Sequence, residues 1–296
     1  MKKIALIYTG QGSQFAGMGR ELYETDEKAR KIFDEIFDIL QNDLKQVMFY
    51  GPDEKLNQTY YSQLAITALA IVLTKKLQEE NKIENINVVT GHSLGEYISL
   101  FAAKKIDMKT LVKLIDFRGK VMQEESEKFS GGMVSVLGME AEKIENLIKN
   151  LENVWIANYN EKNQTVIAGD KKNLELAVEI LKENKARRCI ALNVSGAFHT
   201  NFMKNAAEKL KSEIEKINFE KSEIKIISNV NGKILRDDEI KNELYLHTFN
   251  PVKWIDVVKT LEENVDEIYE IGAKITLIPL IKKISEKNFN LVRITI

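Results

Sequence analysis

The sequence predicts an α/β protein with a mostly parallel sheet and a second, smaller sheet inserted into the chain. Short apolar and β-branched runs alternate with helical patterns near both ends of the chain, as in parallel sheets that helices cover on both faces. A different order of strands and helices interrupts this alternation in the middle. The chain has 296 residues, of which 44% are hydrophobic, so it can bury a large core.

The first part of the chain begins the larger sheet. The apolar run Ile4–Tyr8 predicts a buried strand, and residues 9–14 form the loop that leaves it. Helical patterns follow over 21–49 and 61–76, and the second of these is apolar nearly all round, which predicts a core helix. A further helix begins after Asp107, whose carboxylate is a suitable N-cap.

The most informative stretch lies between these helices. A short β-branched run stops at Gly91, and a helical pattern begins just past Ser93. A strand, a tight turn and a helix with glycine two residues on either side of a serine form the G-x-S-x-G nucleophile elbow. The small residues Gly91 and Gly95 let strand and helix approach closely, which exposes the Ser93 hydroxyl at the positive end of the helix dipole. We therefore expect Ser93 to be a nucleophile.

The segment 124–193 follows a different pattern. Strands are predicted over 133–137, 154–157, 165–168 and 188–192, and helices over 141–149 and 174–181. A polar loop, 158–164, joins the second strand to the third. The order β-α-β-β-α-β is that of the ferredoxin-like unit. We therefore predict a small domain over 124–193 and a large domain made of 1–123 and 194–296.

After this insert the larger pattern resumes. Ala197–Ile217 is expected to be helical, and Pro251 is expected in the first turn of a helix that runs through Leu261. The remaining strands are predicted over 224–227, 268–271 and 291–294, with a helix over 276–284.

The composition excludes several functions. Lys and Arg number 43 and Asp and Glu 44, a balance that points to neither nucleic acid nor a membrane surface as a partner. The longest apolar run, 64–73, is far shorter than a membrane span. The single cysteine, Cys189, fits a reducing compartment, so we expect a cytoplasmic protein. The three histidines are scattered outside any metal-binding motif, and no metal site is expected.

A serine nucleophile needs a base, and the three histidines are the candidates. His92 neighbours Ser93, and on a strained turn its side chain should point away from the hydroxyl. His199 falls in the first turn of the predicted helix 197–217, on its apolar face, where the helix dipole disfavours a cation and leaves a neutral imidazole. His247 precedes a stretch that is typical of a loop, which favours a structural role. We therefore expect His199 to be the base.

One arginine, Arg118, lies within the apolar stripe of its helix. A guanidinium there cannot shed its charge and needs an anionic partner. Two interpretations stay open: a buried pair with an internal carboxylate, or bidentate capture of a substrate carboxylate. An acyl-transfer site also needs two N–H donors for the developing oxyanion. The N–H of Leu94, just after the nucleophile, and the loop 10–12 are the candidates.

Together these residues give the chain a resemblance to malonyl-CoA:acyl carrier protein transacylases, the malonyl-loading enzymes of bacterial fatty-acid synthesis. The shared motifs, in the family's order, are Gly10-Gln11-Gly12-Ser13-Gln14, Gly91-His92-Ser93-Leu94-Gly95-Glu96-Tyr97, Arg118-Gly119 with Met122-Gln123, Val194-Ser195-Gly196-Ala197-Phe198-His199, and Asn250-Pro251-Val252 with Trp254. The resemblance runs nearly end to end. It implies an α/β-hydrolase-like large domain with a mostly parallel sheet, interrupted by the ferredoxin-like small one, with the active site in the groove between them.

The resemblance also implies roles in catalysis. It makes Ser93 the nucleophile and His199 the general base. The backbone N–H groups of Gln11 and Leu94 would form the oxyanion hole. His247 stands where family members commonly have Gln, and it would orient the catalytic histidine through its main-chain carbonyl.

Further residues would bind the substrate. Arg118 would hold the free carboxylate of the malonyl group, and Met122 would line the same site. Phe198, in the Gly-Ala-Phe-His form typical of malonyl-selective members, would exclude an α-methyl branch. Thr9 replaces the Pro usual before Gly-Gln-Gly, which is a departure from the family pattern in the first loop.

The activity that the resemblance implies is ping-pong transfer of malonyl from malonyl-CoA to the phosphopantetheine thiol of acyl carrier protein, through a malonyl-serine ester. It implies no cofactor, and we expect a monomer. Carrier proteins are acidic, so Lys204, Lys209 and the pair Lys104-Lys105 are candidates for a docking surface.

Two other functions stay open. A serine hydrolase would use Ser93, then Asp237 or Asp238, then His247, in the chain order usual for such sheets. A non-catalytic acyl-carrier-binding module is the second alternative, against which the combination of Ser93, His199 and Arg118 argues.

Overall fold

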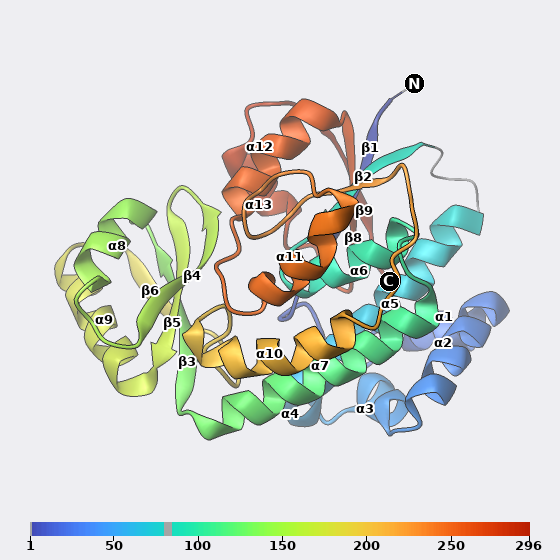
Figure 1. Ribbon diagram of the computed structural model, residues 1–296, viewed down its shortest axis with the longest axis horizontal. Helices are drawn as coiled ribbons and strands as arrows, with labels where there is room; N and C mark the ends of the chain where they lie inside the picture. Colours follow the sequence, from blue (N-terminus) through green and yellow to red (C-terminus); the bar gives the residue numbers. More distant parts are fainter. Residues whose placement is uncertain (1, 80–84) are drawn as a thin grey trace.

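The computed structural model describes residues 2–79 and 85–296. It contains two sheets, and the smaller one lies to one side of the larger in Figure 1. The long helix α7 (Met108–Lys128) runs from the helices beside the larger sheet to the first strand of the smaller one. The chain leaves the larger sheet once, builds the smaller sheet and returns.

Within the described residues, the larger sheet has five strands in the order β7-β2-β1-β8-β9, and every pairing is parallel. The strands are β1 (Ile4–Tyr8), β2 (Ile86–Gly91), β7 (Lys225–Ile226), β8 (Glu267–Ile271) and β9 (Asn290–Ile294). Tyr8 and Gly91 are register partners, so the loops that leave β1 and β2 start side by side. The predicted parallel sheet is confirmed, and ligands of such sheets bind at this carboxyl edge.

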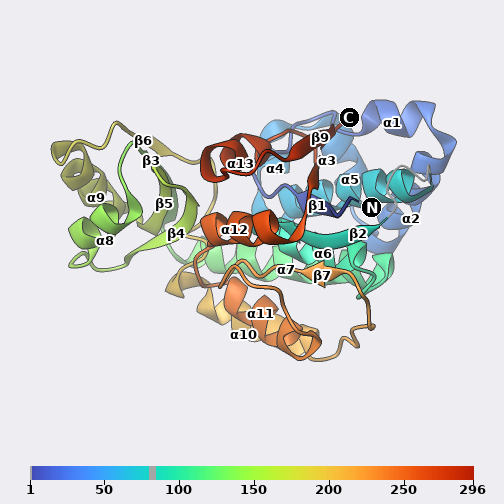
Figure 2. The same cartoon turned by 90° about the horizontal axis from the view of Figure 1, so that it is seen from above.

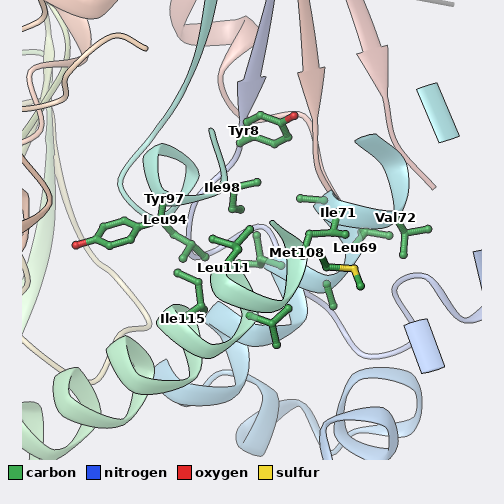
Figure 3. Packing of buried hydrophobic residues seen from close by; sticks show 14 of the residues in the cluster. Tyr8, Leu69, Ile71, Val72, Leu94, Tyr97, Ile98, Met108, Leu111 and Ile115 are labelled. Carbon is green, nitrogen blue, oxygen red and sulfur yellow. The ribbon is translucent and has the colours of Figure 1, made fainter. Parts of the chain in front are cut away.

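Helices cover both faces of the larger sheet (Figure 2). Successive side chains of β1 alternate between two cores, because strand side chains point to opposite faces: Leu6 and Tyr8 to one, Ala5 and Ile7 to the other. Figure 3 shows the first core, where Tyr8 lies above side chains such as Leu69, Ile98 and Leu111. The helices of this core are α2 (Glu27–Leu40), α3 (Leu44–Tyr50), α4 (Asp53–Leu56), α5 (Thr59–Glu79), α6 (Leu94–Ala102), α7, α10 (Lys204–Ile214) and α11 (Ile240–His247), with α1 (Arg20–Thr25) packed beside them. The helices of the second core are α12 (Trp254–Asn264) and α13 (Ile278–Ile284).

The smaller sheet has the order β4-β5-β3-β6, and its pairings are antiparallel. Its elements are β3 (Gly131–Leu137), α8 (Ala141–Ile148), β4 (Val154–Glu161), β5 (Gln164–Asp170), α9 (Lys171–Glu183) and β6 (Arg188–Ala191). The predicted β-α-β-β-α-β order is confirmed. The two helices cover one face of this sheet, and Met133 and Val166 on the other face pack against Met122 of α7 and Phe198. That face therefore borders the larger sheet's loops.

The predicted loop 158–164 is wrong. Strand β4 continues to Glu161, and β5 begins at Gln164. Asn158 and Asn160 are buried within β4, and register shifts beside them interrupt the regular alternation of side chains. Polar residues are typical of loops, and here they line the interior instead.

The helix predicted from Ala197 is also wrong at its start. A 3₁₀ turn covers Asn201–Met203, and α10 begins only at Lys204. His199 has a φ of 60°, a left-handed conformation that no right-handed helix can contain. His199 therefore lies in a loop before the helix.

The segment before α12 differs from the prediction too. Pro251 does not lie in the helix, which begins at Trp254. Val252 instead pairs with β4: the Tyr159 N–H donates to its carbonyl oxygen at 2.9 Å, and its own N–H donates to the Ala157 carbonyl oxygen at 2.9 Å. This pairing ties the smaller sheet to the larger part of the molecule.

The boundary between the two parts falls within a helix. Helix α7 continues to Lys128, past the predicted boundary at 123/124, and the division into 1–123 with 194–296 and 124–193 stays a prediction. Across residues 2–79 and 85–296, no helix combines the length and the apolar character that crossing a membrane requires.

Candidate active site

The turn after β2 bends sharply at Ser93, whose backbone has a φ of 53° and a ψ of −109°. Strand β2 ends at Gly91, and α6 begins at Leu94. A Cβ on Gly91 would lie 2.5 Å from the backbone of Gly95, and a Cβ on Gly95 would lie 2.2 Å from the carbonyl oxygen of Tyr8. Both glycines are therefore required by the close approach of strand and helix, as in the elbow predicted from the sequence.

The loop after β1 contacts this elbow. A Cβ on Gly10 would lie 2.5 Å from the carbonyl oxygen of His92, so glycine is again needed for the approach. The neighbouring Gln11 lines a cavity together with Ser93 and Leu94. Two loops at the carboxyl edge of the larger sheet thus meet at the serine.

The imidazole beside the serine is that of His199. The Ser93 Oγ lies 2.8 Å from the His199 Nε2. On the other side of the ring, Nδ1 lies 2.9 Å from the carbonyl oxygen of His247 and 3.2 Å from that of Asn250. Carbonyl oxygens only accept hydrogen bonds, so the proton sits on Nδ1 and Nε2 accepts from the serine hydroxyl. The tautomer is the one that a general base requires.

The environment of His199 keeps its ring neutral. Burial, followed by the positive charge of Arg118, lowers the pKa of His199 to about 3. The sequence-based expectation gave a different cause, the dipole of a helix that contains the residue, and this is wrong because His199 precedes the helix. The neutral imidazole expected from the sequence therefore results from burial and from a nearby cation.

The cation, Arg118, lies on α7 and is 1% exposed. Its Nη1 donates to the side-chain oxygen of Gln63 at 2.5 Å, and its guanidinium carbon lies 4.6 Å from the centroid of the Tyr97 ring. Among the residues that the structure describes, Nε and Nη2 have no hydrogen-bond partner. A buried guanidinium with two unused donor groups is suited to bind a carboxylate in bidentate geometry.

One cavity of about 190 Å³ joins these groups. Seven residues predicted for the site line it, namely Gln11, Ser93, Leu94, Arg118, Met122, Phe198 and His199. The eighth, His247, lies behind His199 and contributes its carbonyl oxygen. The smaller sheet forms the rest of the cavity wall. The residues that it contributes lie on the face that α8 and α9 do not cover, and they are Met133, Asn158, Asn160 and Val166. The site lies between the two sheets.

Several residues of this region were not predicted from the sequence. The side-chain oxygen of Gln63, on the core helix α5, accepts from Arg118, and the Asn160 Oδ1 accepts a hydrogen bond from the His92 Nε2 at 2.9 Å. The N–H of Ser93 donates to the side-chain oxygen of Asn229 at 2.9 Å. These partners are polar residues brought in from distant segments, and no local spacing in the sequence marks them. The His92 ring interacts with Asn160, away from the Ser93 hydroxyl.

Comparison with known proteins places this arrangement in a family. Residues 5–293 match the family described as acyl transferase domain. The chain belongs to this acyltransferase family. Among curated proteins, the acyltransferase is 37% identical over 293 residues to the malonyl CoA-acyl carrier protein transacylase of Bacillus subtilis (strain 168), with 97% of this chain and 92% of the relative covered. The protein of the same name from Haemophilus influenzae is 34% identical, with 96% and 93% covered.

Solved structures of similar proteins agree with this assignment. The malonyl-CoA:acyl carrier protein transacylase of Xanthomonas oryzae pv. oryzae superposes with a TM-score of 0.94 at 30% identity, covering 100% of the acyltransferase and 95% of that chain. A complex of a type II PKS acyl-carrier protein with its malonyl-transacylase gives a TM-score of 0.92 at 33% identity, covering 99% and 96%. The fold class predicted from the sequence is therefore confirmed.

Proposed function

We propose that this acyltransferase moves the malonyl group from malonyl-CoA to the phosphopantetheine thiol of acyl carrier protein, through a malonyl ester of Ser93. The observation that carries the proposal is one cavity holding three groups: the Ser93 Oγ, the His199 Nε2 that lies 2.8 Å from it, and the guanidinium of Arg118. A nucleophile with its base explains acyl transfer. A buried cation in the same cavity explains why the preferred acyl group is one whose free carboxylate the cation can bind.

In the first half of the reaction, the Ser93 Oγ attacks the thioester carbonyl carbon while its proton moves to the His199 Nε2. The tetrahedral intermediate then collapses: the carbon–sulfur bond breaks, and the imidazolium returns its proton to the sulfur of coenzyme A. The products of this half are coenzyme A thiol and the malonyl-serine ester. The carbonyl oxygens of His247 and Asn250 hold the Nδ1–H throughout and keep the ring in place.

The oxyanion of the intermediate needs donors that are already in position. The N–H of Leu94 is the first of helix α6, and such N–H groups have no partner within their helix. We assign it as one donor, and the N–H of Gln11 as the other. Both residues line the cavity beside Ser93, which supports this assignment. The N-terminal end of the helix dipole adds favourable potential at the same point.

Arg118 has two effects on a malonyl substrate in this proposal. It binds the carboxylate through the donors that the described protein residues leave unused. Its charge is also a cause of the lowered His199 pKa, so a bound carboxylate that offsets this charge makes the imidazole a stronger base. The correct substrate thereby activates the base that its own reaction requires.

In the second half, the thiol of the carrier protein's phosphopantetheine arm takes the place of coenzyme A. It gives its proton to His199 and attacks the ester carbonyl, and Ser93 leaves with the proton returned. The structure of a carrier protein with its malonyl-transacylase, which this chain resembles, supports such a partner. Phe198 and Met122, both buried against the cavity, restrict the space around the acyl group.

The alternative hydrolase arrangement has little support. His247 is buried, and neither of its ring nitrogens has a hydrogen-bond partner among the described residues. Asp237 forms an ion pair with Lys105 at 2.6 Å, and Asp238 forms one with Arg236 at 3.2 Å. The acids that a Ser-Asp-His order would require are therefore paired with other residues, and the His247 ring is hydrogen-bonded to neither of them nor to Ser93.

The expected docking lysines differ in their exposure. Lys105 is 2% exposed and paired with Asp237, so it is unsuited to bind a partner. Lys209 pairs with Glu124 at 2.9 Å on the surface, and Lys204 is exposed at the start of α10. We propose that Lys204 and Lys209 form part of the surface of this enzyme that binds the carrier protein. We also propose that the enzyme is monomeric and cytoplasmic and uses no cofactor.

A turnover assay with malonyl-CoA and the holo form of an acyl carrier protein tests the proposal. We expect malonyl-carrier protein and free coenzyme A in equal amounts, with both products depending on the phosphopantetheine thiol. A hydrolase would release free malonate and coenzyme A without the carrier protein. A binding module would leave malonyl-CoA unchanged. Either of these last results would contradict the proposed function.

A further inference from the structure

The turn 228–231 lies far from Ser93 in the sequence but is hydrogen-bonded to the elbow that carries Ser93. Asn229, which follows the short strand β7, is fully buried. Its side-chain Nδ2 donates to the carbonyl oxygen of Gly91 at 2.9 Å, and its Oδ1 accepts from the N–H of Ser93 at 2.9 Å. The one amide therefore bridges the two sides of the bend, which requires a donor and an acceptor on the same short side chain.

This bridge acts at the strained residue of the elbow. Ser93 has a positive φ, which a residue with a Cβ rarely adopts and which the surrounding structure must therefore enforce. The hydrogen bond from the Ser93 N–H to the Asn229 Oδ1 holds the Ser93 backbone in that conformation. It also occupies the Ser93 N–H, so the oxyanion is left to the N–H groups of Leu94 and Gln11.

The turn 228–231 is itself held by hydrogen bonds to two buried carboxyl groups. The Glu96 Oε2 accepts from the N–H of Asn229 at 3.1 Å, and the Glu243 Oε1 accepts from the Ser228 hydroxyl at 2.6 Å and from the Val230 N–H at 3.1 Å. Glu96 lies in the first turn of α6, the helix that starts at the elbow. Hydrogen bonds therefore join the elbow to Asn229, and a further one joins Asn229 to Glu96, which lies on the helix that begins at the elbow.

The remaining polar group of Asn229 is also used. Its carbonyl oxygen accepts from the N–H of Lys253 at 2.8 Å, in the segment that leads into α12. The same segment carries Asn250, whose carbonyl oxygen lies 3.2 Å from the His199 Nδ1. Asn229 thus connects the serine's elbow with the chain that orients the histidine.

We propose that Asn229 is a positioning residue for the transfer reaction, which holds the Ser93 Oγ in line with the His199 Nε2 by bridging Gly91 and Ser93. The inference rests on the proposed function, in which Ser93 is the nucleophile. Asn229 does not line the substrate cavity, so its loss acts on the rate of Ser93 acylation and leaves substrate binding unchanged.

Asn229→Ala tests this, with Asn231→Ala as the matched control. Asn231 lies in the same turn and is exposed, and its side chain accepts only from the N–H of Lys233 among the hydrogen bonds of the described residues. We expect the single-turnover rate of Ser93 acylation by malonyl-CoA to fall about 10- to 100-fold in Asn229→Ala, because a small misplacement of a reacting group costs this much. The KM for malonyl-CoA should not change, and Asn231→Ala should react at the wild-type rate. A wild-type acylation rate in Asn229→Ala, or a raised KM with an unchanged rate, would overturn the inference.

Two further measurements keep the test decisive if Asn229→Ala folds poorly. Glu96→Gln retains an oxygen that can accept from the Asn229 N–H, so it should acylate at close to the wild-type rate, whereas Glu96→Ala should be slower. Hydrogen exchange in the peptide 88–97 should be faster in Glu96→Ala than in Glu96→Gln, since Glu96 then no longer holds Asn229, whose side-chain oxygen accepts from the Ser93 N–H. Equal rates and equal exchange in the two variants would contradict the inference.

Failure of the inference differs from failure of the proposed function. If Ser93 of the wild-type protein carries no malonyl group after reaction with malonyl-CoA, the proposed function fails. If wild-type Ser93 carries it and Asn229→Ala acylates equally fast, only the positioning role of Asn229 fails.

Discussion

The two sheets of this molecule contribute to one cavity in different ways. Loops and helices around the parallel sheet supply the hydroxyl of Ser93, the imidazole of His199 and the guanidinium of Arg118. The antiparallel sheet supplies a wall, formed by side chains of its open face such as Met133 and Val166. The carboxyl ends of parallel strands converge, so side chains and free N–H groups from several loops meet at one point. The antiparallel sheet instead contributes side chains that determine the shape of the cavity.

This contrast makes predictions. Changes around the parallel sheet should remove the chemistry, whereas changes on the antiparallel sheet should alter which acyl group is accepted.

The largest effect is expected at the elbow. Ser93→Ala removes the nucleophile, so malonyl transfer should fall more than about 10⁴-fold and covalent labelling should be lost. Steady-state transfer to holo carrier protein measures the rate, and thermal unfolding checks that the variant folds. A variant with more than a tenth of the wild-type rate would show that the parallel sheet does not supply the nucleophile.

The base should come next. His199→Ala should lower kcat/KM by about 10²- to 10⁴-fold, the usual contribution of general base catalysis. His247→Gln is the matched control, because it retains the main-chain carbonyl oxygen that accepts from the His199 Nδ1. We expect this control to keep near wild-type activity. The reverse outcome, with loss only in His247→Gln, would favour the hydrolase arrangement.

Replacement of the cation should change selectivity more than folding. Arg118→Ala should reduce kcat/KM for malonyl-CoA by about 100-fold, since charge-assisted bonds to the substrate carboxylate are lost. Loading of acetyl-CoA should be retained or raised, because removal of the positive charge also raises the His199 pKa. Both substrates are compared in the same acylation assay. Unchanged kcat/KM for malonyl-CoA would refute the role of Arg118.

A change on the antiparallel sheet should have a smaller effect. Met133→Ala enlarges the cavity at the wall that the antiparallel sheet forms, so the ratio of kcat/KM for methylmalonyl-CoA to that for malonyl-CoA should rise about 10-fold. The malonyl rate itself should change little. A loss of malonyl transfer as large as in His199→Ala, in a folded variant, would show that the smaller sheet takes part in the chemistry.

The smallest effect is expected on mild acidification. His199 must be neutral to accept the proton, and its pKa of about 3 means that it stays neutral as the pH falls from 7 to 5. The kcat/KM profile, which reports the free enzyme, should be nearly flat over this range. An imidazole with the ordinary pKa near 6.5 would instead lose activity roughly 10-fold per pH unit below that value. Such a decline would contradict the burial of His199 beside Arg118.

The sequence predicts those parts of the molecule that a local pattern encodes. The apolar run of β1 and the glycines around Ser93 are local patterns, and both predict the element that the structure contains. Arg118 was recognisable because a charge stands in an apolar helical stripe. Asn158, Asn160 and Asn229 were not predicted, because polar residues between apolar runs are typical of loops. Asn160 and Asn229 bond to partners 68 and 136 positions away, and no spacing within one segment encodes such contacts.

The position of His199 shows the same limit. The sequence indicated that it is the base, yet placed it in a helix. His199 has a left-handed backbone, and its ring contacts the carbonyl oxygens of His247 and Asn250, which lie 48 and 51 positions further along the chain and which no local spacing indicates.

The most direct test of the central claim is mass spectrometry of the protein after brief reaction with malonyl-CoA. We predict a single malonyl adduct on the peptide that contains Ser93, which disappears when holo acyl carrier protein is added. Absence of the adduct, or its presence on another peptide, would contradict the account of malonyl transfer through this serine.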